Sequence, residues 1–190
     1  MKRHQELLTA AIARDGEAQQ ALFAGDEARA RAAFLEAAEL YRRSWEGAPP
    51  ASYGRLVGVL KSSVLAGEGT EQARYVQAQL GHEGEESPTA SYAQALAALI
   101  LGDDAAAEAW TRHMRIGSEA FARTADAISA LATGDPEAYA AAARTIVEDF
   151  ERRADHLTGV AVADTALMLQ RLAARRGLAA ELSSPVLPAV

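Results

Sequence analysis

The chain lacks cysteine, and only 6% of its 190 residues are aromatic. Without cysteine it forms no disulfide, no thiolate metal site and no cysteine nucleophile. It also lacks an excess of basic residues, because 26 Asp and Glu outnumber 19 Lys and Arg and give a net charge of -7. A broad basic face is the usual mark of a nucleic-acid binder, so we expect no nucleic-acid partner.

No long apolar run is present either. The longest stretch without a charged residue runs from Ser87 to Gly102 and contains Ser, Thr and Gln. A membrane-spanning helix needs about 20 mainly apolar residues, so this stretch is too short and too polar. The N-terminal segment MKRHQELLTAAIARDGEAQQ is charged and lacks the apolar core of a secretion signal. We therefore expect a cytoplasmic protein without a membrane partner.

Motifs of known catalytic or cofactor-binding chemistry are missing. The sequence has no Gly-x-Ser-x-Gly turn, no phosphate-binding loop and no dinucleotide fingerprint. Its histidines never stand one helical turn apart, and none belongs to a Glu-x-x-His motif. Carboxylates do cluster between Glu148 and His156, but arginines lie among them, which favours ion pairs on a solvated helix face. We predict no catalytic residue, no metal and no cofactor.

The sequence is rich in helix-favouring residues and contains a recurring turn. Alanine, the best helix former, is abundant, and 49% of all residues are hydrophobic. Four times an apolar helix end is followed by glycine and then an acidic residue, at Gly25, Gly67, Gly102 and Gly134. Glycine ends a helix because it enters the left-handed conformation without steric cost. The acidic residue then caps, or favourably charges, the start of the next helix.

These turns are separated by 42, 35 and 32 residues, close to the period of about 34 in tetratricopeptide repeats. The first turn resembles that family in its spacing of Gly25, Asp26, Ala30, Phe34 and Ala37. Seven positions before three of the glycines stands a small residue, where the family's paired helices touch: Ala18, Ala95 and Ala127. The repeats are degenerate, because all four turns lack the family's tyrosine. The resemblance implies antiparallel helical hairpins stacked in a right-handed superhelix.

We therefore predict an all-α fold with about nine helices in a single helical-repeat domain over residues 1–190. The expected helices cover residues 3–24, 26–46, 51–66, 70–81, 88–101, 103–115, 118–133, 135–154 and 160–176.

Two other segments are predicted to be non-helical. The segment GHEGEESPT, residues 81–89, contains two glycines and a proline, which predicts a loop that could join two halves of the domain. In the C-terminal tail, 178–190, Pro185 and Pro188 block a helix. Its apolar Val-Leu pair is expected to pack back on the last helices.

Two stretches rich in aromatic and basic side chains are candidate partner-binding edges, because Trp, Tyr and Arg dominate binding hot spots. The first is RRSWEGAPPASYGRL, residues 42–56, and the second is AWTRHMRIG, residues 109–117. The candidate side chains are Arg42, Arg43, Trp45, Tyr53, Arg55, Trp110, Arg112 and His113. The alternative for the first stretch is a rigid corner with core aromatics. For the second it is a set of cations that stabilises a helix C-terminus.

Three further residues draw attention within apolar helical patterns. Gly54 and Gly58 lie four residues apart, so we expect them on one helix face that a neighbouring helix approaches closely; a ligand near the backbone is the alternative. Asp164 is an acidic residue in the otherwise apolar segment VAVADTALML. If it is buried, its carboxylate needs a partner or takes a raised pKa; near a helix start it could equally be exposed.

The C-terminal stretch from Leu172 to Pro188 is similar to the closing segment of helical immunity proteins from bacterial polymorphic toxin systems, through its helix, Arg-Gly turn and Leu-Pro tail. That resemblance implies a protein that binds and blocks one toxin.

A helical-repeat array offers a concave surface and little chemistry of its own. Our first expectation is therefore a non-enzymatic module that binds another protein or a peptide, and an immunity protein is the alternative. The second alternative is a small-ligand binder or enzyme that uses a cleft between helices, which a pocket with converging Arg, His and Asp side chains would support. A homodimer is also expected if the alanine-rich end faces pair.

Overall fold

The computed structural model describes residues 2–81 and 86–189. In that part of the chain it contains nine α-helices and no β-strand, which confirms the predicted all-α fold with about nine helices. The helices are α1 (Arg3–Phe23), α2 (Glu27–Glu46), α3 (Gly54–Leu65), α4 (Thr70–Leu80), α5 (Pro88–Leu101), α6 (Asp104–Met114), α7 (Glu119–Thr133), α8 (Pro136–Glu151) and α9 (Asp164–Arg175).

Three of the four predicted corners form as expected. Gly25 ends the first of them in the left-handed region, with a φ angle of 73°. The next residue, Asp26, caps α2, because its carboxylate accepts a hydrogen bond from the backbone N–H of Arg29 at 3.0 Å. The same pairing of a left-handed glycine with a capping aspartate recurs at Gly102–Asp103 and Gly134–Asp135.

The fourth corner differs from the prediction. Gly67 follows α3 with a φ angle of 87°, but Glu68 does not cap α4. The N-cap position is taken by Gly69, at a φ angle of 134°, and α4 begins one residue later. Glu68 instead forms an ion pair with Arg31 of α2, which ties this corner to the first hairpin.

Two helices begin three or more residues later than predicted, and α8 ends at residue 151 and not at 154. α3 starts at residue 54 and not at 51, because Ala51 has a φ angle of 63° and the Ser52 hydroxyl donates to the carbonyl of Pro49 at 2.8 Å, which closes a turn. α9 starts at residue 164 and not at 160, because the preceding segment is held in a non-helical form. There the Ala163 N–H donates to the Val186 carbonyl of the C-terminal tail at 2.8 Å.

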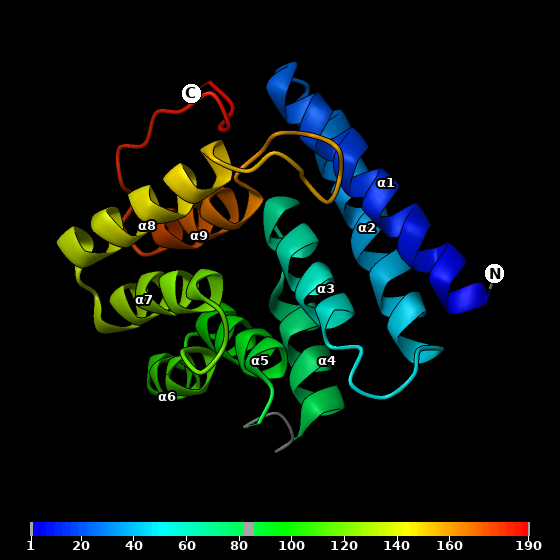
Figure 1. The fold of residues 1–190 in the computed structure, drawn as a ribbon, viewed down its shortest axis with the longest axis horizontal. Helices are drawn as coiled ribbons and strands as arrows, with labels where there is room; N and C mark the ends of the chain where they lie inside the picture. Colours follow the sequence, from blue (N-terminus) through cyan, green and yellow to red (C-terminus); the bar gives the residue numbers. More distant parts are fainter. Residues whose placement is uncertain (1, 82–85, 190) are drawn as a thin grey trace.

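The helices pack in chain order as antiparallel neighbours, but α9 breaks that order (Figure 1). It packs against α8 and also against α3 and α7. Its Arg171 side chain donates to the carbonyl of Leu65, at the end of α3, at 2.5 Å. In an open solenoid each repeat contacts only its neighbours. The contact of α9 with α3 departs from that pattern, and the predicted right-handed superhelix stays a prediction.

Small residues allow the close helix packing. Buried hydrophobic side chains from all nine helices form a continuous cluster. The small residues that precede three of the turn glycines, Ala18, Ala95 and Ala127, are fully buried in it. Phe34, the aromatic residue after the first turn, is fully buried as well. Alanine at such positions brings two helix backbones together at little cost in side-chain entropy.

The predicted loop at 81–89 falls partly outside the described residues, because these omit 82–85. On its near side Gly81 follows α4, and on its far side the Ser87 hydroxyl accepts a hydrogen bond from the Ala90 N–H and caps α5. Its role as a joint stays a prediction. Within residues 2–81 and 86–189, every helix is too short or too polar to cross a lipid bilayer.

The C-terminal tail is non-helical over residues 178–189, as predicted. Val186 is buried against the core, and Leu187 packs on it while partly exposed. The Ser184 hydroxyl donates to Glu151 of α8 at 2.6 Å. The tail therefore packs back on the last helices, as its apolar Val-Leu pair predicts.

Candidate functional site

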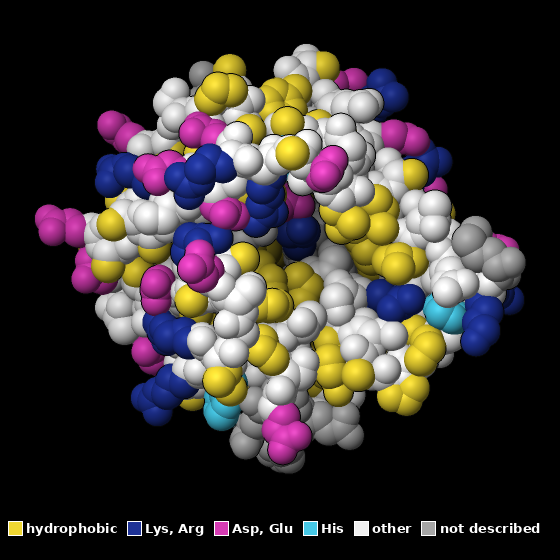
Figure 2. Space-filling view, viewed as in Figure 1, with side chains coloured by type: hydrophobic (Ala, Val, Ile, Leu, Met, Phe, Trp, Pro, Cys, Tyr) yellow, Lys and Arg dark blue, Asp and Glu magenta, His cyan; other side chains and the backbone are white. Residues whose placement is uncertain are grey.

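A cavity of about 650 Å³ opens in the middle of the molecule. Side chains from α1, α2, α3, α5, α7, α8 and α9 line it, together with the segment 152–163, which runs from α8 to α9. Figure 2 shows this hollow at the centre of the face, with charged side chains gathered to its left and hydrophobic ones to its right. Its volume lies within the usual range of small-molecule sites, about 300–1,000 Å³.

Apolar side chains form most of the cavity wall. They come from α1, α3, α7, α8 and the 152–163 segment: Leu8, Ile12, Val57, Phe121, Ile146 and Val162. An apolar wall excludes water and strengthens every polar interaction inside the cavity.

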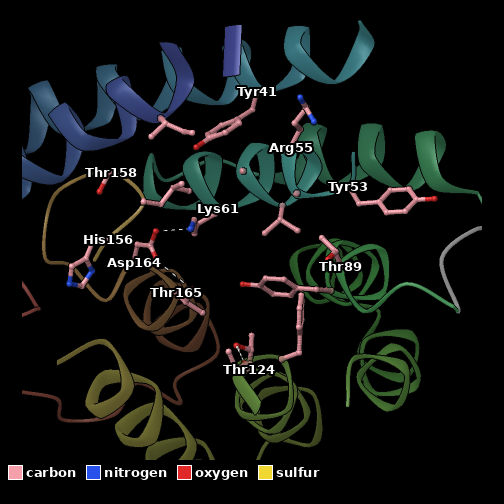
Figure 3. Close-up of a pocket in the computed structure, with 18 of the residues that line it drawn as sticks. Tyr41, Tyr53, Arg55, Lys61, Thr89, Thr124, His156, Thr158, Asp164 and Thr165 are labelled. Atoms are coloured by element: carbon pink, nitrogen blue, oxygen red, sulfur yellow. Dashed lines mark hydrogen bonds and ion pairs between the residues drawn. The ribbon is translucent and has the colours of Figure 1, made fainter. Parts of the chain in front are cut away.

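An ion pair stands at one side of the cavity. The Lys61 ammonium of α3 donates to the Asp164 carboxylate of α9 at 2.6 Å, and the two side chains are only 17% and 15% exposed (Figure 3). Burial is the largest single effect and lowers the pKa of Lys61, but Asp164, Tyr92 and Asp15 together outweigh it and raise that pKa. Lys61 is therefore held in its charged form. Asp164 is largely buried and has a partner, and it also stands at the start of its helix, as the first residue of α9.

A second carboxylate lies behind this pair. Asp15 of α1 is buried and accepts hydrogen bonds from the Tyr41 hydroxyl at 2.9 Å and the Ser62 hydroxyl at 2.7 Å. Burial raises its pKa to about 6, although the charge of Lys61 and the two hydroxyl groups oppose the rise. Two carboxylates thus face one ammonium in this part of the core.

The raised pKa of Asp15 predicts an unusual pH dependence of stability. The folded chain binds a proton here that the unfolded chain, with a pKa near 3.8, has already released. The stabilisation is fully present below that unfolded value and is lost as the pH rises through about 6. From about pH 4 to about pH 7 the free energy of unfolding should fall relative to that of an Asp15→Asn variant. Urea unfolding over a pH series measures this, and a difference that does not change with pH would contradict it.

Gly58 of α3 creates the space for Tyr41. A Cβ atom at this position would lie 2.8 Å from Cγ of the Tyr41 ring, so the ring lies directly on the α3 backbone. This contact confirms the predicted close approach of a neighbouring helix at Gly58. Gly54 behaves differently, because a Cβ atom there would meet nothing within 4 Å.

Tyr92 of α5 also lines the cavity. Its side chain is buried, and its hydroxyl lies near the Thr165 hydroxyl but is in standard hydrogen-bond geometry with no described residue. Burial raises its pKa to about 12, although nearby Lys61 and the Thr165 hydroxyl oppose the rise. The hydroxyl is therefore neutral and can donate a hydrogen bond. Its ring makes an edge-to-face contact with Phe121, with the ring centroids 6.2 Å apart, which fixes its orientation.

The 152–163 segment closes one side of the cavity and reaches back to α1. The Thr158 hydroxyl donates to Gln19 of α1 at 2.5 Å. Gly16 permits this approach, since a Cβ atom there would lie 3.0 Å from the Thr158 carbonyl oxygen. Figure 3 shows His156 and Thr158 on this segment, to one side of the Lys61–Asp164 pair.

The structure places some residues of the first predicted partner-binding edge in the cavity lining and the others outside it. Tyr53 and Arg55 line the cavity, but the Arg55 guanidinium donates to Ser44 at 2.8 Å and points toward α2 in Figure 3. Trp45 packs against Tyr53, with the ring centroids 6.0 Å apart. Arg42 forms ion pairs within α2 with Glu39 and Glu46, and Arg43 is exposed outside the cavity lining.

The second predicted edge lies on α6, apart from the cavity. None of Trp110, Arg112 and His113 lines the cavity. Trp110 is partly buried against the core and stands beside His113, with the ring centroids 5.7 Å apart. The structure therefore does not bring the two predicted edges together at this site.

Three central residues, Asp15, Lys61 and Tyr92, were not predicted from the sequence. Lys61 carried a usable signal: it is one of two lysines in the chain, and it stands in the apolar pattern GRLVGVLKSSVL. A lysine in such a pattern needs an acidic partner, which Asp164 could have suggested. Asp15 and Tyr92 carried no comparable signal.

Comparison of the chain with protein-family models, with curated proteins and with solved structures finds no match. The described part of the chain holds no group of three or more His, Asp and Glu placed to bind a metal ion. The cavity is therefore interpreted from its own geometry.

Proposed function

We propose that this chain reversibly binds a small, mainly apolar molecule in the central cavity, and that a neutral oxygen of that molecule accepts hydrogen bonds from Lys61 and Tyr92. The observation that carries the proposal is the Tyr92 hydroxyl. It is buried, it lines the cavity and, although the Thr165 hydroxyl lies near it, no described residue meets it in standard hydrogen-bond geometry. A buried donor without a partner is costly, which favours an acceptor supplied by a ligand.

The neighbouring ammonium offers further donors. Lys61 has three N–H groups, and within the described residues only one hydrogen bond, to Asp164, engages them. The Asp164 carboxylate is more fully used, since its other oxygen accepts from the Thr165 hydroxyl at 3.4 Å. This part of the cavity therefore offers N–H and O–H donors that no described residue engages. It suits a carbonyl or hydroxyl oxygen.

The charges near Lys61 favour a neutral acceptor here. Asp164 already balances the ammonium, and Asp15 adds a second negative charge. A ligand carboxylate in the same place would meet two carboxylates and one ammonium. The raised pKa of Lys61 also keeps its amine protonated, so that it lacks the free electron pair of an amine nucleophile. These features support binding over amine chemistry.

The neutral naphthyl ketone Prodan tests the proposal, because its fluorescence emission moves to shorter wavelength in apolar surroundings. We expect saturable binding with blue-shifted emission. Tyr92→Phe should weaken it by about three- to tenfold, the usual worth of one neutral hydrogen bond. Fluorescence titration measures both effects. An Ala120→Trp variant, which adds bulk to the cavity wall, should block the dye and so locate it.

Tyr75→Phe is the matched control. Its hydroxyl is also buried without a geometric hydrogen-bond partner, but it lies on α4 outside the cavity lining. Failure of Prodan to bind, or equal binding by the Tyr92→Phe variant, would contradict the proposal. Recognition of a partner protein or peptide, the immunity function and the homodimer stay predictions. Failure of the cavity to bind Prodan would favour these predictions over a small ligand.

A further inference from the structure

A pair of arginines forms a second polar region of the same cavity. Arg123 of α7 and Arg153 of the 152–163 segment both line it, and both bind the Asp149 carboxylate of α8, at 2.7 Å and 2.6 Å. One carboxylate leaves one of the two positive charges unbalanced. Glu119 lies 3.4 Å from Arg123, but its side chain is 93% exposed, so solvent screens its charge.

The two guanidinium groups also keep unused donors. Asp149 engages Nε and Nη2 of Arg153, and within the described residues Nη1 of Arg153 makes no hydrogen bond. Nε of Arg123 is likewise without a bond in this part of the chain. The Arg153 guanidinium lies 3.7 Å from the centroid of the Phe150 ring, and that contact holds it against the cavity wall.

The two polar regions therefore differ in charge. The Lys61 region holds one ammonium and two carboxylates, whereas the Arg123–Arg153 region holds two guanidinium groups and one partly buried carboxylate. The Arg123–Arg153 region therefore carries an excess of positive charge, although the whole chain has a net charge of -7. An arginine pair with free N–H groups beside an apolar wall suits an oxyanion attached to an apolar body.

We propose that the ligand of the cavity is an amphipathic anion whose carboxylate or similar oxyanion binds at Arg123 and Arg153. This inference rests on the proposed function and names its ligand class. The apolar body of the ligand then lies along the wall between the two polar regions. Its anionic end, together with Asp149, balances the charges of the two guanidinium groups. Arginine binds oxyanions through paired N–H groups, which gives the site a preferred direction for its ligand.

Competition between two matched molecules and bound Prodan tests the inference. 2-Naphthoate carries the anion, and methyl 2-naphthoate is its neutral ester. Both should displace the dye, and naphthoate should bind about tenfold more tightly, as expected for a charge-assisted hydrogen bond. Arg153→Gln should bring that ratio close to one. Asp149→Asn should raise the ratio instead, because it removes the carboxylate that competes for both arginines.

The opposite signs for Arg153→Gln and Asp149→Asn separate binding from loss of structure. Arg144→Gln is the control, because Arg144 is an exposed residue of α8 outside the cavity lining. Equal affinity for naphthoate and its ester in the wild-type chain would overturn the inference and leave the proposed function standing. A preference for naphthoate that Arg153→Gln leaves unchanged would also overturn it. If naphthoate, its ester and Prodan all fail to bind, the proposed function itself is contradicted, and the inference that rests on it falls with it.

Discussion

Replacing Lys61 by Met is expected to lower the free energy of unfolding by about 3–5 kcal/mol. Met has a similar length and fills the same space, so the loss comes mainly from charge. The substitution leaves Asp164, whose side chain is 15% exposed, and the buried Asp15 without their shared counter-ion. A buried carboxylate without a partner is destabilising because its desolvation is no longer compensated. Urea unfolding followed by far-UV circular dichroism measures the change.

Two further variants show where that loss comes from. The double variant Lys61→Met, Asp164→Asn should lose less than the two single changes added together, since it removes both charges of one pair. Lys2→Met replaces the only other lysine, which is exposed, and should change the free energy of unfolding by less than about 0.5 kcal/mol. Additive losses in the double variant would show that the Lys61–Asp164 pair is not the source.

Gly58→Ala is expected to destabilise the chain by about 2 kcal/mol, the sum of overpacking and a weakened hydrogen bond. The new methyl group would stand 2.8 Å from the Tyr41 ring and force that ring off α3. The movement pulls the Tyr41 hydroxyl away from Asp15, where it now donates at 2.9 Å. The loss exceeds the usual gain of about 0.5–1 kcal/mol when alanine replaces glycine within a helix. Thermal and urea unfolding both measure it.

Gly54→Ala on the same helix is the matched control. A methyl group there meets nothing within 4 Å, so we expect no loss of stability and a gain of up to about 1 kcal/mol. Equal effects of the two substitutions would contradict the proposed role of Gly58, since only one of the two glycines lies under an aromatic ring.

Local signals in the sequence predicted the helices well, because they act over a few residues. A left-handed glycine followed by a capping aspartate defines a corner wherever it occurs, as at Gly25 and Asp26. The prediction failed where a distant contact decided the outcome. Glu68 pairs with Arg31 of another helix and does not cap its own, and the start of α9 depends on a bond to Val186 in the tail.

The cavity was harder to predict for the same reason. Lys61 and Asp164 stand 103 positions apart in the chain, so neither segment alone reveals their contact, and only the two charges considered together suggest it. Each was visible only as a charge in an apolar helix, and only Asp164 was recognised. The aromatic and basic edges were predicted from composition, which identifies residues suited to binding. It does not say which way they face, and Arg55 bonds to Ser44 on α2.

The contact between α9 and α3 joins the last helix to the third, so that α3 to α9 form a closed set of packed neighbours. In an open array a terminal repeat frays or is removed while the rest stays folded, because only one interface is lost. Here the loss of α9 removes the counter-ion of Lys61 and one wall of the cavity in a single step. No fragment that ends before α9 contains a complete cavity. Unfolding is therefore expected to be all-or-none, and a bound ligand should raise the stability of every helix together by mass action.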